Sequence, residues 1–215
     1  MKKKTVLSIL AALIVSAGYL FNNFTAPGAV PVSIPAVVTE IPQQIAEASR
    51  EGMYPNGFIQ AKVSKVTDGD TLEISYRGKE YKVRLLDVDT PESVKPGTPV
   101  QPYAKEASRY TGDKVLNRQV RLVFDKGLKD RYERLLAFVI LEDGTFLNAA
   151  LVSEGYARVE TVSPNTTHKK YFEGLQEEAI NNKKGLWGLP EEKQPFVKTK
   201  KGDYVPRYYV DRKAS

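Results

Sequence analysis

The sequence predicts an α+β fold, in which five β-strands form a small closed barrel and three α-helices pack against it. Three observations carry this prediction. Residues 58–88 alternate apolar and polar side chains in three short runs that are separated by tight turns. A helical segment follows, then two more strand-like runs, and finally two more helical segments. Five strands with helices after the third and the fifth match the plan of an OB-type barrel.

The first three strands are expected to form a meander. FIQAKVSKV (58–66) and TLEISY (71–76) lie on either side of a DGD turn, which predicts a hairpin. A second turn at RGKE leads into the third strand, YKVRLLDV (81–88). The proline-rich run VKPGTPVQP (94–102) is expected to be a surface loop beside the end of that strand.

The remaining elements follow from periodicity and stop signals. Ala104, Ala107 and Val115 recur at helical spacing, which predicts a helix over 103–116. Glycines are expected to end the last two helices, at Gly155 and Gly185. The other predicted elements are strands over 119–125 and 135–141, joined by the charged loop KGLKDRYER (126–134), and helices over 146–157 and 167–187.

The ends of the chain differ in composition from this domain, which we place at 57–189. Residues 1–25 begin with three lysines and continue with a long uncharged apolar run, the order of a signal peptide or an N-terminal membrane anchor. Residues 26–56 form a Pro/Ala-rich spacer. We therefore expect a protein that is secreted or anchored on the outer face of the cell membrane, with its N-terminal segment transiently or permanently in the membrane.

The positive charge is concentrated outside the domain. The chain carries a net charge of +6, but three of the lysines stand in the first four residues. From residue 193 onward there are seven Lys/Arg and two Asp/Glu, which leaves 22 Lys/Arg against 24 Asp/Glu elsewhere. The domain is therefore no general polyanion binder. The basic tail with its tyrosines, 190–215, could be a nucleic-acid-binding arm, a disordered solvated extension or a segment attracted to anionic surface polymers.

Residue types limit the possible chemistry. The chain has no cysteine and one histidine, so a Ser-His-Asp triad and the common zinc sites are excluded. His168 is expected to be a solvated residue at a helix start. Carboxylates and arginines remain, and together they suit a hard cation, Ca²⁺ or Mg²⁺, that is held by oxygens and acts on a phosphate.

Two acidic turns stand where strands end. DGDT (68–71) and DVDTPE (87–92) follow neighbouring strands of the meander, so Asp70 and Asp89 could share one cation together with the carbonyl of Thr90. Arg84 and Arg134 lie near strand edges beside acidic residues. Each guanidinium could bind a phosphate through two parallel hydrogen bonds.

These segments resemble the staphylococcal nuclease (thermonuclease) family. The resemblance runs from Gly57 to Trp187 in the family's order and rests on several motifs: VSKVTDGDTLEI, VRLLDVDTPES, FDKGLKDRYERLLAFV, LNAALVSEGYARV and GLW. It implies the same five-stranded OB-type barrel with three helices. It also implies a monomeric nuclease that needs one Ca²⁺ and cleaves RNA and single- or double-stranded DNA to 3′-phosphate ends. A non-catalytic nucleic-acid-binding module at the cell surface is the alternative.

The resemblance also implies roles for individual residues. It assigns catalysis to Arg84, Glu92 and Arg134, and it makes Glu92 the residue that orients or deprotonates the attacking water. The other implied roles are calcium binding by Asp70, Asp89 and the carbonyl of Thr90, support of the metal by Asp68 and Thr71, and contact with the substrate's terminal phosphate by Arg131 and Tyr132.

Three departures from the family pattern stand out. Glu133 replaces a glycine that usually separates the loop tyrosine from the loop arginine, so the turn that places Arg134 could differ. Asp87 stands where an apolar residue or glycine is more usual, and it either joins the metal site or faces solvent; we expect solvent. Thr161 and Ser163 stand where the best-known member of the family has tyrosines near the bound base, so stacking there would be lost and substrate affinity or base preference could differ. None of these departures removes a residue that the implied mechanism requires.

Overall fold

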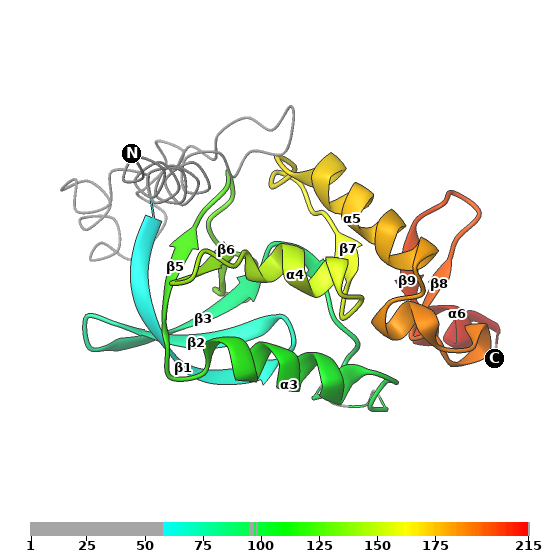
Figure 1. The fold of residues 1–215 in the computed structure, drawn as a ribbon, viewed down its shortest axis with the longest axis horizontal. Helices are drawn as coiled ribbons and strands as arrows, with labels where there is room; N and C mark the ends of the chain where they lie inside the picture. Colours follow the sequence, from blue (N-terminus) through cyan, green and yellow to red (C-terminus); the bar gives the residue numbers. More distant parts are fainter. Residues whose placement is uncertain (1–57, 95–96, 98, 215) are drawn as a thin grey trace, which may run out of the picture. The chain divides into compact units, whose positions relative to one another are not determined.

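A computed structural model describes residues 58–94, 97 and 99–214. The expected signal or anchor and the spacer lie outside these residues. Within the described part, no helix is both long and apolar enough to cross a membrane. A barrel forms one part of the described structure, and the last strands and helix of the chain lie apart from its strands, as Figure 1 shows.

Five strands form a closed barrel in the order β1-β2-β3-β6-β5, which confirms the predicted fold class. The pairs are antiparallel except for β3 and β6, which are parallel, and the pairing of β1 with β5 closes the barrel. The barrel strands are β1 (Phe58–Asp68), β2 (Thr71–Tyr76), β3 (Lys79–Leu85), β5 (Gln119–Val123) and β6 (Leu135–Leu141).

The turns at the two ends of β2 each depend on a glycine. Arg77 and Gly78 both have positive φ, 48° and 77°, as a two-residue hairpin loop with right-handed strand twist requires. At the other end of β2, a Cβ on Gly69 would lie 2.7 Å from the methyl group of Thr90. Glycine at position 69 therefore lets the two acidic turns approach each other.

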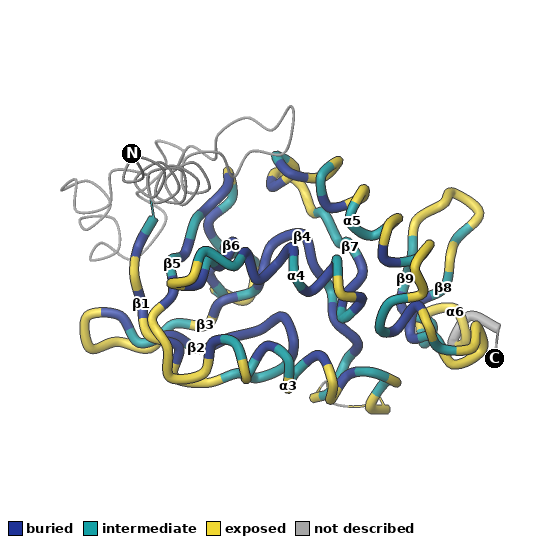
Figure 2. The backbone as a smooth tube through the Cα atoms, viewed as in Figure 1, coloured by how far each residue is buried: buried dark blue, intermediate teal, exposed yellow. Residues whose placement is uncertain are grey.

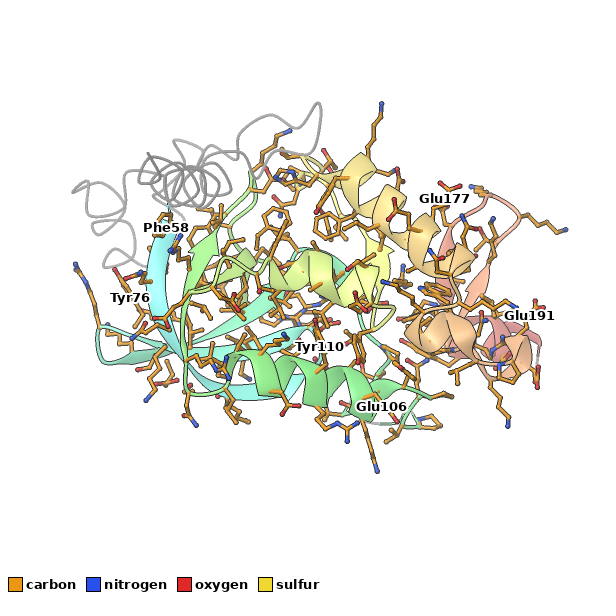
Figure 3. The ribbon with its side chains drawn as sticks, in the orientation of Figure 1. Phe58, Tyr76, Glu106, Tyr110, Glu177 and Glu191 are labelled. Carbon is orange, nitrogen blue, oxygen red and sulfur yellow. The ribbon has the colours of Figure 1, made fainter. Side chains whose placement is uncertain are left out.

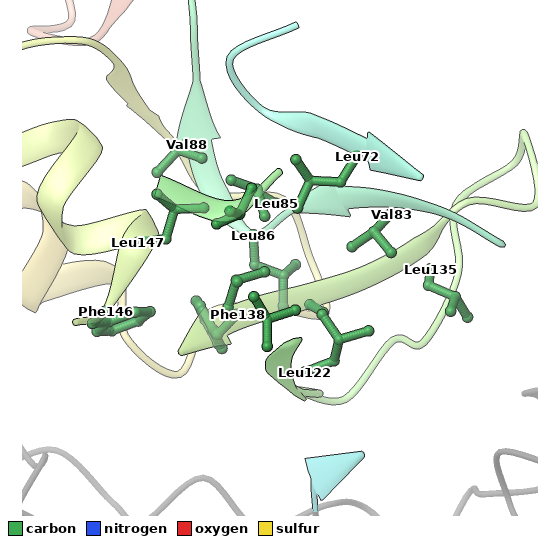
Figure 4. Close-up of a cluster of buried hydrophobic side chains, with 14 of the residues drawn as sticks. Leu72, Val83, Leu85, Leu86, Val88, Leu122, Leu135, Phe138, Phe146 and Leu147 are labelled. Atoms are coloured by element: carbon green, nitrogen blue, oxygen red, sulfur yellow. The ribbon is translucent and has the colours of Figure 1, made fainter. Parts of the chain in front are cut away.

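The barrel interior is filled by the inward-facing side chains of its strands, and Figure 4 shows part of this cluster. Alternation places Val83 and Leu85 of β3 inside, so that Arg84 points to the outer face. Leu72 and Ile74 of β2 also point into the barrel. Alternation therefore explains how a strand that contributes to the core can also carry Arg84.

Three helices match the predicted segments: α3 (Ala104–Val115), α4 (Leu147–Ser153) and α5 (Lys169–Asn181). Helix α3 packs on β1, and α4 packs on α5 and β6. Tyr110 of α3, labelled in Figure 3, stacks on Tyr156 just after α4, with ring centroids 4.3 Å apart. His168 does precede α5 but is buried against Phe138, so the expectation of a solvated side chain is wrong.

Further short elements were not predicted. β4 (Asp87–Asp89) pairs with β7 (Arg158–Glu160) in a two-stranded sheet beside the barrel. The C-terminal segment contains η2 (Gly185–Gly188), η3 (Glu191–Lys193), β8 (Phe196–Lys198), β9 (Tyr204–Pro206) and α6 (Arg207–Ala214). β8 and β9 form a hairpin that we call the C-terminal hairpin, residues 196–206.

The C-terminal hairpin is anchored by a small apolar cluster. Phe196 and Trp187 are buried together, and Tyr204 packs edge-on against Trp187 with ring centroids 4.8 Å apart. Arg207 donates to the backbone carbonyl of Glu191, which is labelled in Figure 3. The described tail residues are folded, so the alternative of a disordered solvated extension is wrong for them.

Candidate active site

The two acidic turns meet through the carboxylate of Asp70. Its Oδ2 accepts hydrogen bonds from the backbone N–H of Thr90, at 2.8 Å, and from the Thr90 hydroxyl, at 3.0 Å. Its Oδ1 accepts one from the hydroxyl of Thr71, at 3.0 Å. The end of β4 is therefore fastened to the start of β2, which places Asp70 and Asp89 in one site as the sequence predicted.

Arg84 lies between the two carboxylates that were predicted to bind the metal. Its Nε is 3.4 Å from Oδ1 of Asp70, and one terminal nitrogen is 3.5 Å from Oδ1 of Asp89 and 3.3 Å from Glu160. The other terminal nitrogen donates to the carbonyls of Leu85 and Val88. Tight charge-assisted hydrogen bonds measure about 2.7–2.9 Å, so carbonyls fix one edge of the guanidinium while the other edge is held loosely.

Burial and mutual repulsion raise the pKa of two carboxyl groups in the site. The pKa of Asp68 rises to about 7, chiefly because of burial and also because Asp70 and Glu92 are near. The pKa of Asp89 also rises to about 7 through burial, with Arg158 opposing the shift and Glu160 adding to it. For Arg84, burial lowers the pKa, but the carboxylates of Asp70, Asp89 and Glu160 outweigh it and the pKa rises.

This donor set fits a hard divalent cation. Asp70 and Asp89 offer carboxylate oxygens, which Ca²⁺ and Mg²⁺ prefer. A cation beside them would offset the burial and, to a lesser extent, the repulsion that raise the pKa of Asp68 and of Asp89. Within the described residues, no three acidic, histidine or cysteine side chains are arranged to hold a metal ion. Hard cations also accept backbone oxygen and water as ligands.

The two predicted supporting residues lie against Asp70. Thr71 donates to its carboxylate, and the backbone N–H of Asp70 donates to Oδ1 of Asp68 at 3.3 Å. Glu92 follows two residues after Thr90 in a loop that Gln101 braces. The backbone N–H of Glu92 donates to Oε1 of Gln101 at 2.6 Å, and Gln101 N–H donates to the carbonyl of Glu92 at 2.9 Å.

Arg134 lies in a separate turn just before β6. In the parallel pairing of β3 with β6, Arg84 is the partner of Leu136, and Arg134 precedes Leu136 by two residues. Its Nε donates to Oδ2 of Asp130 at 2.7 Å. Among the contacts of residues 126–134, none joins Arg134 to Asp70 or Asp89.

Arg131 and Tyr132 are exposed in the same turn. The guanidinium of Arg131 lies 4.9 Å from the centre of the Tyr132 ring and donates to its hydroxyl at 2.8 Å. The guanidinium of Arg134 lies 5.6 Å from the same ring. The phosphate-contact residues that the resemblance implied are thus together, on the surface.

The departures from the family pattern at Glu133 and at Asp87 behave differently. Glu133 has φ of 63°, the left-handed region that glycine favours, so the turn keeps a glycine-like backbone. Asp87 is buried, which overturns the expectation that it faces solvent. Burial raises the pKa of Asp87 to about 7, with Thr161 opposing the shift and the charge of Asp125 adding to it.

Sequence reasoning missed Arg158 and Glu160. β4 pairs with β7 so that Asp89 faces Arg158 and Asp87 faces Glu160. Arg158 Nε donates to Oδ2 of Asp89 at 2.8 Å, and its terminal nitrogen donates to Glu160 at 2.6 Å. The signal was the alternation of charges around Val159 in RVE, but three residues are too few to predict a strand. β4 itself is largely buried, as Figure 2 shows.

Comparisons with known proteins identify relatives of this chain. A family described as staphylococcal nuclease homologue matches residues 82–188. The chain is 47% identical over 126 residues to the thermonuclease of Staphylococcus hyicus, covering 59% of this chain and 74% of that protein. It is 46% identical over 125 residues to the thermonuclease of Staphylococcus intermedius, covering 58% and 74%. It is 40% identical over 132 residues to endonuclease YncB of Bacillus subtilis (strain 168), covering 60% and 62%.

The closed barrel, with carboxylates and arginines at the ends of its strands, and these relatives together define the chain as a nuclease. It belongs to the staphylococcal nuclease family.

Proposed function

We propose that this nuclease is a Ca²⁺-dependent phosphodiesterase that cleaves DNA and RNA and leaves 3′-phosphate ends. The observation that carries the proposal is the placement of Asp70 and Asp89 on the same guanidinium, that of Arg84, at the outer face of the barrel. Oxygen donors for a hard cation and a donor for phosphate therefore share one site.

Asp70, Asp89 and the carbonyl of Thr90 would hold the cation, with Asp68 and Thr71 supporting Asp70. When bound, Ca²⁺ polarises a phosphoryl oxygen and offsets negative charge in the site. The hydrogen bonds from Thr90 and Thr71 fix the Asp70 carboxylate before any ligand arrives. Preorganisation of this kind keeps the cost of cation binding low.

The chain's own residues act on phosphorus in one displacement. Glu92 orients a water molecule and accepts its proton while the water oxygen attacks phosphorus. The bond from phosphorus to the 5′ oxygen breaks, and that oxygen takes a proton from solvent. The loosely held edge of Arg84 and the guanidinium of Arg134 donate to the oxygens on which negative charge accumulates.

Arg131 and Tyr132 would contact the terminal phosphate of the substrate from the exposed turn. Their exposure leaves them open to a nucleic-acid strand, and the cation–π contact between them keeps the guanidinium beside the ring. Binding of single-stranded DNA, double-stranded DNA and RNA would need no base-specific readout at such a surface.

We also propose that the protein is an exported monomer. Residues 1–25 would direct export or anchor the chain to the membrane, 26–56 would be a spacer, 57–189 the nuclease domain and 190–215 a C-terminal extension. The proposal rests on the basic start and apolar run of the N-terminal segment, which lies outside the described residues.

The test is cleavage of single-stranded DNA with Ca²⁺, with Mg²⁺ and with chelator, beside the variant Glu92→Gln. We expect cleavage with Ca²⁺ to 3′-phosphate ends, loss of cleavage with chelator, and a loss of about 10²–10⁴ in kcat for the variant, the usual contribution of a general base. Tight binding without cleavage in every condition would instead support the non-catalytic nucleic-acid-binding module.

A further inference from the structure

Four charged side chains beside the candidate site form a closed ring. Arg84 contacts Asp89 at 3.5 Å and Glu160 at 3.3 Å, and Arg158 contacts the same two carboxylates at 2.8 Å and 2.6 Å. Positive and negative charges alternate around the ring, so each group has two opposite neighbours. The pairing of β4 with β7 sets this arrangement, because it places Asp89 opposite Arg158.

Within the ring, Arg158 makes the tight contacts and Arg84 the loose ones. The Arg158 side chain is 9% exposed, which makes it the most buried member of the ring. Arg158 Nε donates a hydrogen bond to Oδ2 of Asp89, whereas Arg84 contacts the other carboxylate oxygen, Oδ1. Arg158 therefore determines the rotation of the Asp89 carboxylate, and it leaves Oδ1 directed toward the shared site.

Arg158 is itself held by the C-terminal hairpin. One of its terminal nitrogens donates to the carbonyl of Tyr204 at 3.0 Å, and its guanidinium lies 5.4 Å from the centre of the buried Phe196 ring. The hairpin lies beyond the residues 82–188 that match the family, yet it contacts a side chain that contacts the candidate metal carboxylate. A contiguous set of contacts thus joins the C-terminal extension to Asp89.

We propose that Arg158 is a positioning residue, held by the C-terminal hairpin, that orients Asp89 for the cation and, through Glu160, orients Arg84 for the phosphate. This inference rests on the proposed function. Partners that orient a metal ligand typically change metal affinity or activity by about 10- to 100-fold when they are removed.

A purely electrostatic role for Arg158 predicts the opposite sign. A cation of the protein near a bound Ca²⁺ repels it, so removal of the Arg158 charge alone would strengthen Ca²⁺ binding. The two roles are separated by Arg158→Lys, which keeps the charge but has a compact ammonium group in place of the planar fork that reaches Asp89, Glu160 and Tyr204 together.

The experiment measures the Kd for Ca²⁺ by titration calorimetry in the wild-type chain, Arg158→Lys, Arg158→Gln and Phe196→Leu. Ile59→Ala is the matched control, since it removes core packing from β1 and so lowers stability without touching the ring. Melting temperatures of the metal-free proteins report the stability of each variant. Separate values of kcat and KM for single-stranded DNA report how each variant affects the action of Arg84 on the phosphate.

The proposal expects Ca²⁺ binding to weaken about 10-fold or more in both Arg158 variants and about 2- to 5-fold in Phe196→Leu, the equivalent of one cation–π contact. It expects Ile59→Ala to melt earlier but to keep the wild-type Kd. Wild-type Kd in Arg158→Lys, or tighter binding in Arg158→Gln, would overturn it. A wild-type chain that binds no Ca²⁺ would overturn the metal assignment itself and this inference with it, so the two failures are distinguishable.

Discussion

The two arginines that we assign to phosphate binding, Arg84 and Arg134, stand in contrasting surroundings. The Arg84 side chain is 13% exposed and lies among Asp70, Asp89 and Glu160, which come from different elements. The Arg134 side chain is 27% exposed and pairs with Asp130 of its own turn. One arginine is held by tertiary structure and the other by a local turn.

This contrast indicates how the two halves of the site are built. Strand pairing sets Arg84, since β3 is hydrogen-bonded to β2 on one side and to β6 on the other. Arg134 depends on a tight turn in which the backbone N–H of Glu133 donates to the carbonyl of Asp130 at 3.0 Å. Changes at Arg84 should therefore affect both stability and catalysis, whereas changes at Arg134 should affect catalysis alone.

The largest effect is expected for Arg84→Gln. The change leaves the buried carboxylate of Asp70 without the guanidinium of Arg84, while Asp89 and Glu160 keep Arg158. Breaking one partner of a buried ion pair costs about 3–5 kcal/mol. It also removes a transition-state donor, worth about 10²–10³ in kcat. Urea unfolding and single-turnover cleavage measure the two losses. If Arg84→Gln were as stable as the wild type, Arg84 would not differ from Arg134 in its contribution to stability.

Arg134→Gln should lower kcat by a similar factor of about 10²–10³. Its pair with Asp130 is partly exposed and lies within one turn, so the free energy of unfolding should change by about 1 kcal/mol. The same two assays measure it, with Lys169→Gln as an exposed-charge control on α5. Turnover within tenfold of the wild type would exclude Arg134 from the catalytic set.

A pH-dependent effect on the free energy of unfolding is expected for Asp87→Asn, which replaces a buried carboxyl group. The pKa of Asp87 is about 7 in the folded protein, against an ordinary value of 3.8. Between these values the folded protein holds a proton that the unfolded chain has lost, so the free energy of unfolding falls as pH rises from about 4 to about 7. Asparagine does not ionise and also tolerates the φ of 59° at this position.

The stability of Asp87→Asn relative to the wild type should therefore increase with pH up to about 7 and then level off, by on the order of a few kcal/mol. Urea unfolding at a series of pH values measures the difference, in which the other titrating groups cancel. A difference that does not change with pH would show that Asp87 is ionised in the folded protein throughout.

The smallest effect is expected for Glu133→Gly in the turn. Glycine relieves the strain of a positive φ but adds entropy to the unfolded chain, so stability should change by less than about 1 kcal/mol. The change also removes a negative charge next to Arg134, which should lower KM for DNA a few-fold at low salt. Steady-state cleavage at two salt concentrations checks this, and a higher KM would mean that the Lys129–Glu133 pair at 2.7 Å supports the turn.

Sequence patterns predicted most barrel strands because apolar and polar residues alternate along them, as in TLEISY, whereas β6 was predicted from LLAFVIL, a short run of apolar residues. They also predicted that Asp70 and Asp89 share a site, because the ends of neighbouring strands must lie close together. They did not predict β4 and β7, since three residues carry no period. The burial of Asp87 and His168 was missed for a different reason: polar residue types favour the surface, and tertiary packing overrode that preference.

The folded C-terminal hairpin was missed because composition dominated the prediction. Seven cations in the last residues indicated a solvated tail, whereas Phe196 and Tyr204 supply the apolar contacts that Trp187 needs. The sign of a folded segment in the sequence was Phe196, a large apolar residue among the cations. Arg158 could not be assigned from sequence, since its partners are 69 and 46 residues away along the chain.

The pairing of β1 with β5 also bears on how folded copies of the protein meet one another. It closes the barrel, so the first and last strands of the sheet are paired with each other and are not open to a strand of another copy, which is a common route to aggregation. With no cysteine, two copies also have no thiols through which they could become joined. Both features favour a folded barrel that stays separate from its neighbours at high concentration.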